Sequence, residues 1–283
     1  MTAYAFRLVN VFAEAPLAGN PLCVFEDARG LDVTTMQALA LQFNLSETTF
    51  VLPSSSATAH VRIFTPTFEM PFAGHPTLGT AHVVRALRGG GDRVTLEMKA
   101  GIIPVEAQGD VWTLQANEPR CRRPTASRAE LAAMLGLREA DLMPEPLWVD
   151  TGSEQLLVPL ASPDAVERAL PDAALMQRHG SNATRAMTYV FARDGAPSDH
   201  RMRARFFFPK HGAVVEDPGT GSACANLGGW LLATGAALPV RIDVFQGDLV
   251  GRPCRLGLEV TSDRRVLVSG RVIEIARGVV ELD

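Results

Sequence analysis

The sequence predicts an α+β fold built from two pseudo-symmetric domains, in each of which a mixed or antiparallel sheet wraps around a central buried helix. The pattern E-x-P-x-x-G-[H/S] occurs twice, as Glu69-Met-Pro-Phe-Ala-Gly-His75 and as Glu216-Asp-Pro-Gly-Thr-Gly-Ser222. Each copy runs into an almost uncharged segment of small and apolar residues, and each lies among short runs typical of strands. Because the same turn-and-helix pattern occurs twice, we expect two matching domains.

The two segments that follow the turns are predicted to be enclosed helices. Residues 76–87 have no continuous polar face, and residues 223–234 have even less of one. A helix that is apolar nearly all round is buried on every side. The Gly and Ala residues allow surrounding backbone to approach closely, which favours enclosure by a curled sheet.

The other elements follow from residue periodicity and turn residues. Strands are expected at 6–12, 22–25, 48–52, 60–64, 93–98, 102–107, 111–115, 147–160, 187–192, 201–208, 240–245, 256–260, 266–269 and 272–275. Helical periods are expected at 32–43 and 127–137. Many strand connections are too short for parallel crossovers, so the sheets are predicted to be antiparallel or mixed.

A polar, Pro-rich stretch at residues 117–124 is the candidate linker. We therefore expect an N-terminal domain at 1–118 and a C-terminal domain at 119–283, with the last strand free to cross back to the first domain.

Composition narrows the class of protein. The chain has 283 residues, is 47% hydrophobic and carries a formal net charge of -4 without a Lys/Arg cluster, which disfavours a nucleic-acid partner. Four cysteines without a C-x-x-C pair predict reduced, mostly buried thiols in a cytoplasmic protein, and no signal peptide is evident. The uncharged stretch 218–240 is long enough for a membrane span, but its Gly residues, Ser222, Asn226 and Pro239 favour a core helix, so no membrane partner is expected.

The two helix starts predict an anion site. A buried helix start exposes backbone N–H groups and the positive end of the helix dipole, so two starts facing each other would form one cleft for a carboxylate or phosphate. The partner expected is a small carboxylate metabolite. The residues predicted to bind it are Gly74, Thr220, Gly221 and Ser222.

Three residues are candidates for catalysis. Glu47 precedes an apolar strand, where it is either a cap or solvated strand end, or a desolvated carboxylate that transfers a proton. His75 is either a structural cap or a substrate contact and proton donor. Asp217 is either ordinary turn chemistry or a group that orients a polar partner such as His75. Glu69 and Glu216 recur at the same position, which predicts a structural role in shaping each turn.

Several other chemistries are disfavoured. His75 and His82 form only a weak metal pair, and there is no H-E-x-x-H or Cys/His cluster, so no metal is assigned. The Gly-rich turn lacks the Lys of a phosphate loop, and no G-x-G-x-x-G follows a strand, so no cofactor is assigned. No G-x-S-x-G surrounds a serine, which disfavours a serine hydrolase.

Five segments together resemble the PhzF-like phenazine-biosynthesis family. They are Val9-Asn-Val-Phe12 with Ala18-Gly-Asn-Pro21, Asn44-Leu-Ser-Glu47, Phe72-Ala-Gly-His-Pro76 and Glu216-Asp-Pro-Gly-Thr-Gly-Ser-Ala223. The resemblance implies two similar domains with the active site in the cleft between them, and a homodimer. It also implies that Glu47 is the acid/base, with His75, Asp217, Gly221 and Ser222 around the substrate. The reaction implied is isomerisation of a dihydro-hydroxyanthranilate by moving a proton along an allylic system, without metal or organic cofactor.

The fold implied is similar to that of diaminopimelate epimerase, whose two cysteine bases correspond to Ala73 and Thr220 here. Neither residue can act as a thiolate, which disfavours a two-cysteine mechanism. The leading hypothesis is a cofactor-independent isomerase that moves a proton on a small carboxylated substrate through Glu47. The alternatives are an amino-acid or hydroxy-acid epimerase or racemase and a non-catalytic metabolite-binding protein.

Overall fold

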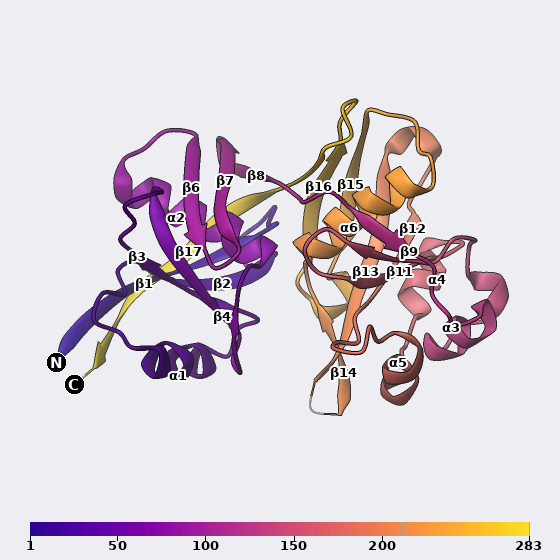
Figure 1. Ribbon diagram of the computed structural model, residues 1–283, viewed down its shortest axis with the longest axis horizontal. Helices are drawn as coiled ribbons and strands as arrows, with labels where there is room; N and C mark the ends of the chain where they lie inside the picture. The colour runs from indigo at the N-terminus through magenta and orange to yellow at the C-terminus, as the bar shows by residue number, and fades with distance from the viewer. Residues whose placement is uncertain (211, 283) are drawn as a thin grey trace. The chain divides into compact units, whose positions relative to one another are not determined.

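The computed structural model describes residues 1–210 and 212–282 (Figure 1). The chain divides into two compact units. The first consists of Met1–Gln115 with Ser269–Asp283, and the second of Ala116–Val268. The long strand β17 (Val266–Leu282) therefore begins in the second unit and ends in the first.

The first unit is built on a mixed sheet. Its other strands are β1 (Thr2–Val11), β2 (Asn20–Phe25), β3 (Thr48–Leu52), β4 (Ala59–Phe64), β5 (Glu69–Met70), β6 (Arg93–Met98), β7 (Gly101–Gln108) and β8 (Val111–Gln115). Parallel pairs join β2 to β3 and β4 to β6, and the pairs β1–β2, β3–β4, β6–β7 and β7–β8 are antiparallel. Because β17 pairs with both β1 and β8, the sheet closes into a barrel.

Two helices belong to the first unit. Helix α1 (Val33–Phe43) begins after Asp32, whose carboxylate accepts from the Thr35 amide, and ends at Asn44 in the left-handed conformation. Helix α2 (Gly74–Arg88) contacts β1, β2, β3, β6, β7 and β8 and is buried from His75 to Ala81. A Cβ at Gly79 would lie 2.7 Å from Leu22 Cδ2, so glycine permits this close approach of helix and sheet.

The second unit has more helix. Its strands are β9 (Arg120–Arg122), β10 (Leu147–Asp150), β11 (Gln155–Pro159), β12 (Thr188–Arg193), β13 (Arg201–Lys210), β14 (Ala213–Asp217), β15 (Val240–Gln246) and β16 (Cys254–Val260). Its helices are α3 (Arg128–Met134), α4 (Pro163–Arg168), α5 (Ala173–His179) and α6 (Gly221–Ala233), with 3-10 turns η1 (Glu139–Asp141), η2 (Pro197–Asp199) and η3 (Asp248–Val250). Helix α6 is buried along most of its length and contacts β9, β10, β11 and β16.

Strand pairing repeats between the units. In the first, β1–β2 is antiparallel, β2–β3 parallel, β3–β4 and β4–β5 antiparallel, and β4–β6 parallel across α2. In the second, β10–β11 is antiparallel, β11–β12 parallel, β12–β13 and β13–β14 antiparallel, and β13–β15 parallel across α6. The prediction of mixed sheets is therefore confirmed, and the repeated turn occupies the same place in both pairing orders.

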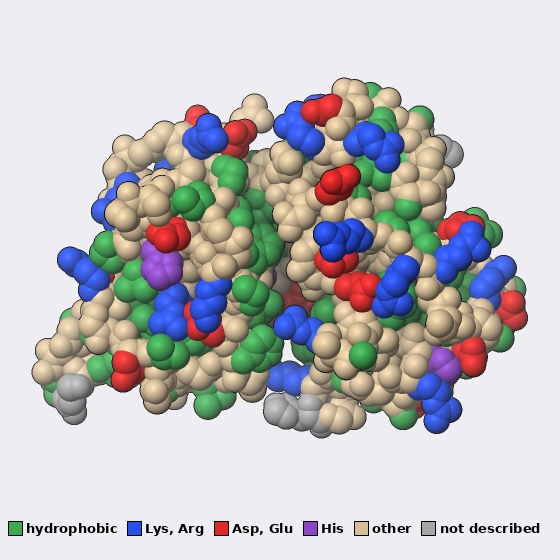
Figure 2. Space-filling model, in the orientation of Figure 1, with side chains coloured by type: hydrophobic (Ala, Val, Ile, Leu, Met, Phe, Trp, Pro, Cys, Tyr) green, Lys and Arg blue, Asp and Glu red, His purple; other side chains and the backbone are tan. Residues whose placement is uncertain are grey.

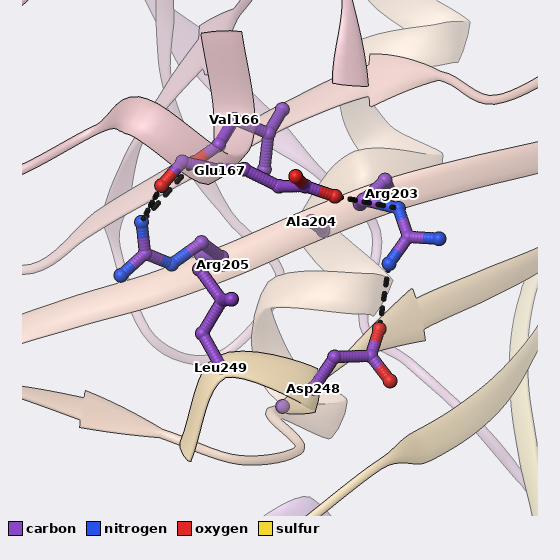
Figure 3. A pocket seen from close by; sticks show the side chains of 8 residues that line it. Val166, Glu167, Arg203, Ala204, Arg205, Asp248 and Leu249 are labelled. Carbon is purple, nitrogen blue, oxygen red and sulfur yellow. Dashed lines mark hydrogen bonds and ion pairs between the residues drawn. The ribbon is translucent and has the colours of Figure 1, made fainter. Parts of the chain in front are cut away.

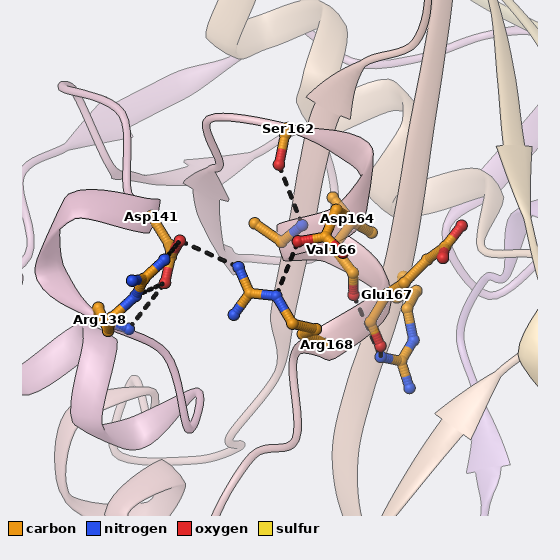
Figure 4. Close-up of polar contacts among 9 residues, drawn as sticks. Arg138, Asp141, Ser162, Asp164, Val166, Glu167 and Arg168 are labelled. Carbon is orange, nitrogen blue, oxygen red and sulfur yellow. Dashed lines mark hydrogen bonds and ion pairs between the residues drawn. The ribbon is translucent and has the colours of Figure 1, made fainter.

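Helices α3, α4 and α5 lie together beside the strands of the second unit (Figure 1). They share an apolar core in which Leu131, Met176 and Val190 are fully buried. Asp141 of η1 accepts from Arg138 and, at 3.0 Å, from Nη2 of Arg168 on α4 (Figure 4). This carboxylate therefore fixes η1 against α4.

Several predicted elements differ from those observed. The helix expected at 127–137 ends at Met134, and the run at 147–160 is two antiparallel strands, β10 and β11. The runs at 266–269 and 272–275 are parts of the single strand β17. Helices α4 and α5 were not predicted, because each is only six or seven residues long and has no extended period.

The cysteines and the uncharged stretch can also be compared with prediction. Cys23, Cys224 and Cys254 are buried free thiols, whereas Cys121 is exposed. Within residues 1–210 and 212–282, no helix combines the length and the apolar character that a membrane crossing requires.

Candidate active site

The two repeated turns start their helices at equivalent residues. Ala73 and Thr220 are the N-caps, both with extended backbone, and neither side chain caps its helix. Gly74 and Gly221 are the first helical residues, followed by His75 and Ser222. The first-turn amides of α2 and α6 therefore lack a side-chain capping acceptor, so both helix starts keep the capacity to bind an anion.

In the first unit, Glu47 and His75 come together. Glu47 immediately precedes β3, and His75 lies in the first turn of α2. Oε2 of Glu47 is 3.4 Å from Nδ1 of His75, and the two side chains are only 16% and 7% exposed. Two residues that are distant in the sequence thus form one buried polar pair.

His75 is neutral at physiological pH. Burial lowers the pKa of its imidazole to about 3, and a hydrogen bond with the Pro21 backbone opposes this shift only in part. The contact with Glu47 therefore joins a carboxyl group to an uncharged ring. Nε2 of His75 is buried and has no hydrogen-bond partner among the described residues, so the hydrogen-bonding capacity of this atom is unused within the protein.

The support for His75 explains the motif Ala18-Gly-Asn-Pro21. Gly19 has a φ of +80°, and a Cβ there would lie 2.6 Å from the Val11 carbonyl oxygen. A glycine is required for the chain to turn so closely against β1. Pro21 then pairs with Asn10 in β1, which places the Pro21 backbone beside His75.

In the second unit, Asp217 and Thr220 form the turn. The Thr220 hydroxyl donates to Oδ2 of Asp217. Nε2 of Gln246, at the end of β15, donates to the Asp217 carbonyl at 2.8 Å and to Oγ1 of Thr220 at 3.0 Å. Thr220 is therefore held by its turn and by β15.

Ser222 has a different partner. Nε2 of Gln155, the first residue of β11, lies 2.9 Å from Oγ of Ser222. Gln155 is almost completely buried. Within the second unit, Ser222 is thus anchored separately from the pair of Asp217 and Thr220.

Glu69 and Glu216 form ion pairs beside the turns, in agreement with their predicted structural role. Glu69 accepts from Nε and Nη2 of Arg62 at 2.7 and 2.8 Å and from Lys99 at 2.6 Å. Glu216 accepts from Nε and Nη2 of Arg205 at 3.0 and 2.7 Å. Each pair joins a turn to the strand that precedes it.

Sequence reasoning missed Arg62, Arg205, Gln155, Asn226 and Gln246. A signal existed for the arginines, because Arg62-Ile-Phe-Thr-Pro and Arg205-Phe-Phe-Phe-Pro extend the repeat upstream as R-x-F-x-P. The three amides gave only a weak signal. Asn226 is a single polar residue in an apolar stretch, whereas Gln155 and Gln246 lie at strand ends beside other polar residues. The partners of all three are distant in the sequence.

The second unit also has a small pocket, whose lining includes Arg205 (Figure 3). Its lining comprises Val166, Glu167, Arg203, Ala204, Arg205, Gly247, Asp248 and Leu249. Nη1 of Arg203 contacts Asp248 at 2.6 Å, and Nη1 of Arg205 contacts the Glu167 carbonyl at 3.0 Å. Both guanidinium groups are occupied, so the pocket offers no cation for a carboxylate ligand.

Surface charge is mixed on the face shown in Figure 2, where Lys and Arg side chains lie among Asp and Glu. Among residues 1–210 and 212–282, no three His, Cys, Asp or Glu side chains are grouped as a metal site would require.

Comparison with known proteins defines the class. The family model described as "Phenazine biosynthesis-like protein" (PhzC-PhzF) matches residues 9–278. The chain is 40% identical to an uncharacterized isomerase of Pasteurella multocida, over 98% of this chain and 94% of the relative. It is 36% identical to a trans-2,3-dihydro-3-hydroxyanthranilate isomerase of Pseudomonas chlororaphis, over 98% and 99%.

A solved structure agrees with these relatives. The chain resembles a Bacillus anthracis phenazine biosynthesis protein of the PhzF family with a TM-score of 0.89 and 26% identity, over the whole of both chains. The mixed sheet-and-helix fold is thus that of PhzF structures. The chain belongs to the PhzC-PhzF family and is a PhzF-family isomerase.

Proposed function

We propose that this protein is a cofactor-independent isomerase that moves a proton along an allylic system of a small carboxylated substrate, with Glu47 as the single acid/base. The substrate class proposed is a cyclic dihydro-hydroxyanthranilate, the compound named for the Pseudomonas chlororaphis relative. The observation that carries the proposal is the buried approach of Glu47 to a neutral His75 at the start of α2.

The proposed proton transfer needs one base that serves two carbons. Oε of ionised Glu47 takes a proton from carbon, and the electron pair of the broken C–H bond shifts the double bond. The Glu47 carboxyl so formed, which can exchange its proton with solvent, then delivers a proton to the far carbon. Neutral His75 donates or accepts a hydrogen bond without changing the charge of the site. Fixed dipoles then stabilise the charge that develops on the substrate.

We further propose that both units contribute to one active site, in a cleft between two pseudo-symmetric domains that each enclose a central helix. In this proposal Glu47, His75 and the Gly74 amide act from one domain, at 1–118. Thr220, Gly221 and Ser222 act from the other, at 119–283, with Asp217 holding Thr220. The two matched helix starts support this division, because each has amides suited to a carboxylate.

The test is proton exchange in deuterated water. Incubating the protein with trans-2,3-dihydro-3-hydroxyanthranilate is expected to give deuterium at carbon with a shifted double bond, observed by NMR. Amino and hydroxy acids are incubated separately as probes of the alternatives. Exchange with inverted configuration would instead indicate an epimerase or racemase. Binding without exchange would indicate a metabolite-binding protein.

Glu47→Gln is the decisive variant. It should lower the exchange rate on the order of 10²- to 10⁴-fold, because proton transfer by a positioned base contributes about this much. The matched control is Glu106→Gln, at an exposed position of β7 that faces solvent. A Glu47→Gln protein that turns over normally would contradict the assignment.

We also propose that the protein acts as a homodimer in the cytoplasm. Light scattering coupled to size-exclusion chromatography would measure the mass of the assembly, and cell fractionation would locate it. A monomeric mass or a membrane-bound fraction would contradict this proposal.

A further inference from the structure

A buried chain of side-chain amides and hydroxyls leads to Ser222. The Thr151 backbone N–H and hydroxyl lie 2.9 and 2.7 Å from Oδ1 of Asn226. Nδ2 of Asn226 lies 2.9 Å from the Ser153 carbonyl and 2.9 Å from Oε1 of Gln155. Asn226 is fully buried on α6, and the chain ends at the contact of Gln155 with Ser222.

The direction of every hydrogen bond in this chain is determined by its two backbone ends. A backbone N–H only donates, so the Asn226 atom facing Thr151 is its oxygen. A backbone carbonyl only accepts, so the atom facing Ser153 is the Asn226 nitrogen. That nitrogen also faces Gln155, whose oxygen must accept. The Gln155 nitrogen therefore faces Ser222 and donates to it.

These hydrogen-bond directions determine whether the Ser222 hydroxyl donates or accepts toward other groups. A serine hydroxyl has one proton and two lone pairs, and one lone pair is taken by Gln155. The proton is then available to donate to another group. Ser222 lies at the start of α6, beside backbone amides that also donate, whereas the nearby Asp217 carboxylate accepts from Thr220.

We propose that Gln155, oriented by Asn226, is a positioning residue that fixes the Ser222 hydroxyl as a hydrogen-bond donor and so selects a carboxylate as the group bound there. The proposal rests on the proposed function, which assigns Ser222 to the substrate carboxylate. A carboxylate accepts from every donor in this array, whereas a carboxamide presents an NH₂ group that meets donors unfavourably.

The experiment uses a carboxylate and a carboxamide of the same shape as probes. Isothermal titration calorimetry of the wild-type protein with anthranilate and anthranilamide is expected to show at least about tenfold tighter binding of anthranilate. In Gln155→Glu, an ionised carboxylate at position 155 can only accept a hydrogen bond. The Ser222 hydroxyl then donates its proton to this carboxylate and no longer to the ligand. Anthranilate affinity should then fall by at least about tenfold, with little change for anthranilamide.

The Ser222→Ala variant distinguishes an effect that passes from residue 155 through the Ser222 hydroxyl, here called the relay, from simple charge repulsion between residue 155 and the ligand. If the relay acts through the hydroxyl, Gln155→Glu costs much less anthranilate affinity in the Ser222→Ala background than in the wild type. An equal cost in both backgrounds would mean repulsion alone and would overturn the inference. Gln108→Glu, at an exposed position of β7, is the matched control. Thermal denaturation tests whether each variant folds. If Gln155→Glu does not fold, Gln155→Met replaces it. This variant adds no charge and is expected to reduce the preference for the carboxylate.

The outcomes distinguish this inference from the proposed function. A Gln155-dependent carboxylate preference without isomerisation would overturn the proposed reaction alone. Isomerisation by a wild-type protein that shows no carboxylate preference, including one that binds neither probe, would overturn the inference alone.

Discussion

Arg205 and Glu216 form a nearly buried ion pair in which the arginine also binds the end of a helix. Nε and Nη2 contact Oε2 of Glu216, while Nη1 donates to the carbonyls of Val166, Glu167 and Ala169 near the end of α4. The side chains are 13% and 7% exposed. Because Asp217 follows directly, this arginine connects α4 to the second repeated turn.

The first unit contains the same arrangement. Arg62 lies over the Phe64 ring and pairs with Glu69, just as Arg205 lies over Phe207 and pairs with Glu216. Phe64 stands opposite Glu69 in the strand register, and Phe207 stands opposite Glu216. The repeat therefore extends from the turn into the strand before it.

Replacing Arg205 by Ala is expected to destabilise the protein by about 3 to 5 kcal/mol, because Glu216 would be left as an unpaired buried charge. Arg205→Lys should be only partly tolerated, since an ammonium cannot make the forked contacts of a guanidinium. Urea denaturation measures both. The control Arg255→Lys alters a half-exposed pair with Asp243 and should change stability by less than about 1 kcal/mol. Equal effects at both arginines would contradict the anchoring role.

His75 predicts a pH dependence of stability. Its folded pKa, about 3, lies below the unfolded value near 6.5, so the unfolded chain binds the extra proton between these values. Stability should therefore fall as pH drops from about 6.5 toward 3, by an amount on the order of a few kcal/mol, and should be unaffected by this group above pH 7. His75→Asn should flatten that dependence in urea denaturation measured across this range. An unchanged slope would show that His75 is not buried neutral.

Asp141 also predicts a loss of stability in acid, in this case through a carboxylate that is charged in the folded protein. Hydrogen bonds from Arg138 and then Arg168 hold the pKa of this carboxyl well below its usual range. Its contribution to stability is therefore complete above the unfolded pKa, near 3.9, and is lost as pH falls below about 4. Asp141→Asn should lower the melting temperature at pH 7 and converge toward the wild type in acid. Asp92→Asn, which alters an exposed side chain, serves as the control. A difference in melting temperature between Asp141→Asn and the wild type that did not change with pH would contradict the prediction.

Because helices α2 and α6 are closely packed, we expect methyl groups added to their buried glycines to lower the stability of the protein. A Cβ at Gly79 would lie 2.7 Å from Leu22 Cδ2, and one at Gly229 would lie 2.7 Å from Pro119 Cβ. Overpacking of about 1 to 3 kcal/mol outweighs the helix propensity of Ala, about 1 kcal/mol, so both Gly→Ala variants should lose stability. Gly90→Ala meets no atom within 4 Å and should be neutral. Stabilisation at Gly79 or Gly229 in urea denaturation would contradict this packing argument.

Much of the local structure could be predicted because it is encoded locally. The helix expected at 32–43 is α1, and the meander at 93–98, 102–107 and 111–115 matches β6, β7 and β8. Periodicity could not predict that β17 continues from Val266 to Leu282, because Gly270 and Arg271 resemble a break between strands. The continuity comes from its pairing partners β1 and β8, which are far away in the sequence.

The candidate site divides in the same way. By itself, the sequence determined the two repeated turns, a helix after each turn, and Glu47 and His75 as candidates, because these depend on short motifs. The helices begin two residues earlier than predicted, at Gly74 and Gly221 instead of residues 76 and 223. The tertiary structure decided that Glu47 lies beside His75, that this histidine is uncharged, and that Gln155 faces Ser222. Contacts between distant residues and the loss of water around a side chain arise only when the chain packs, so no local pattern specifies them.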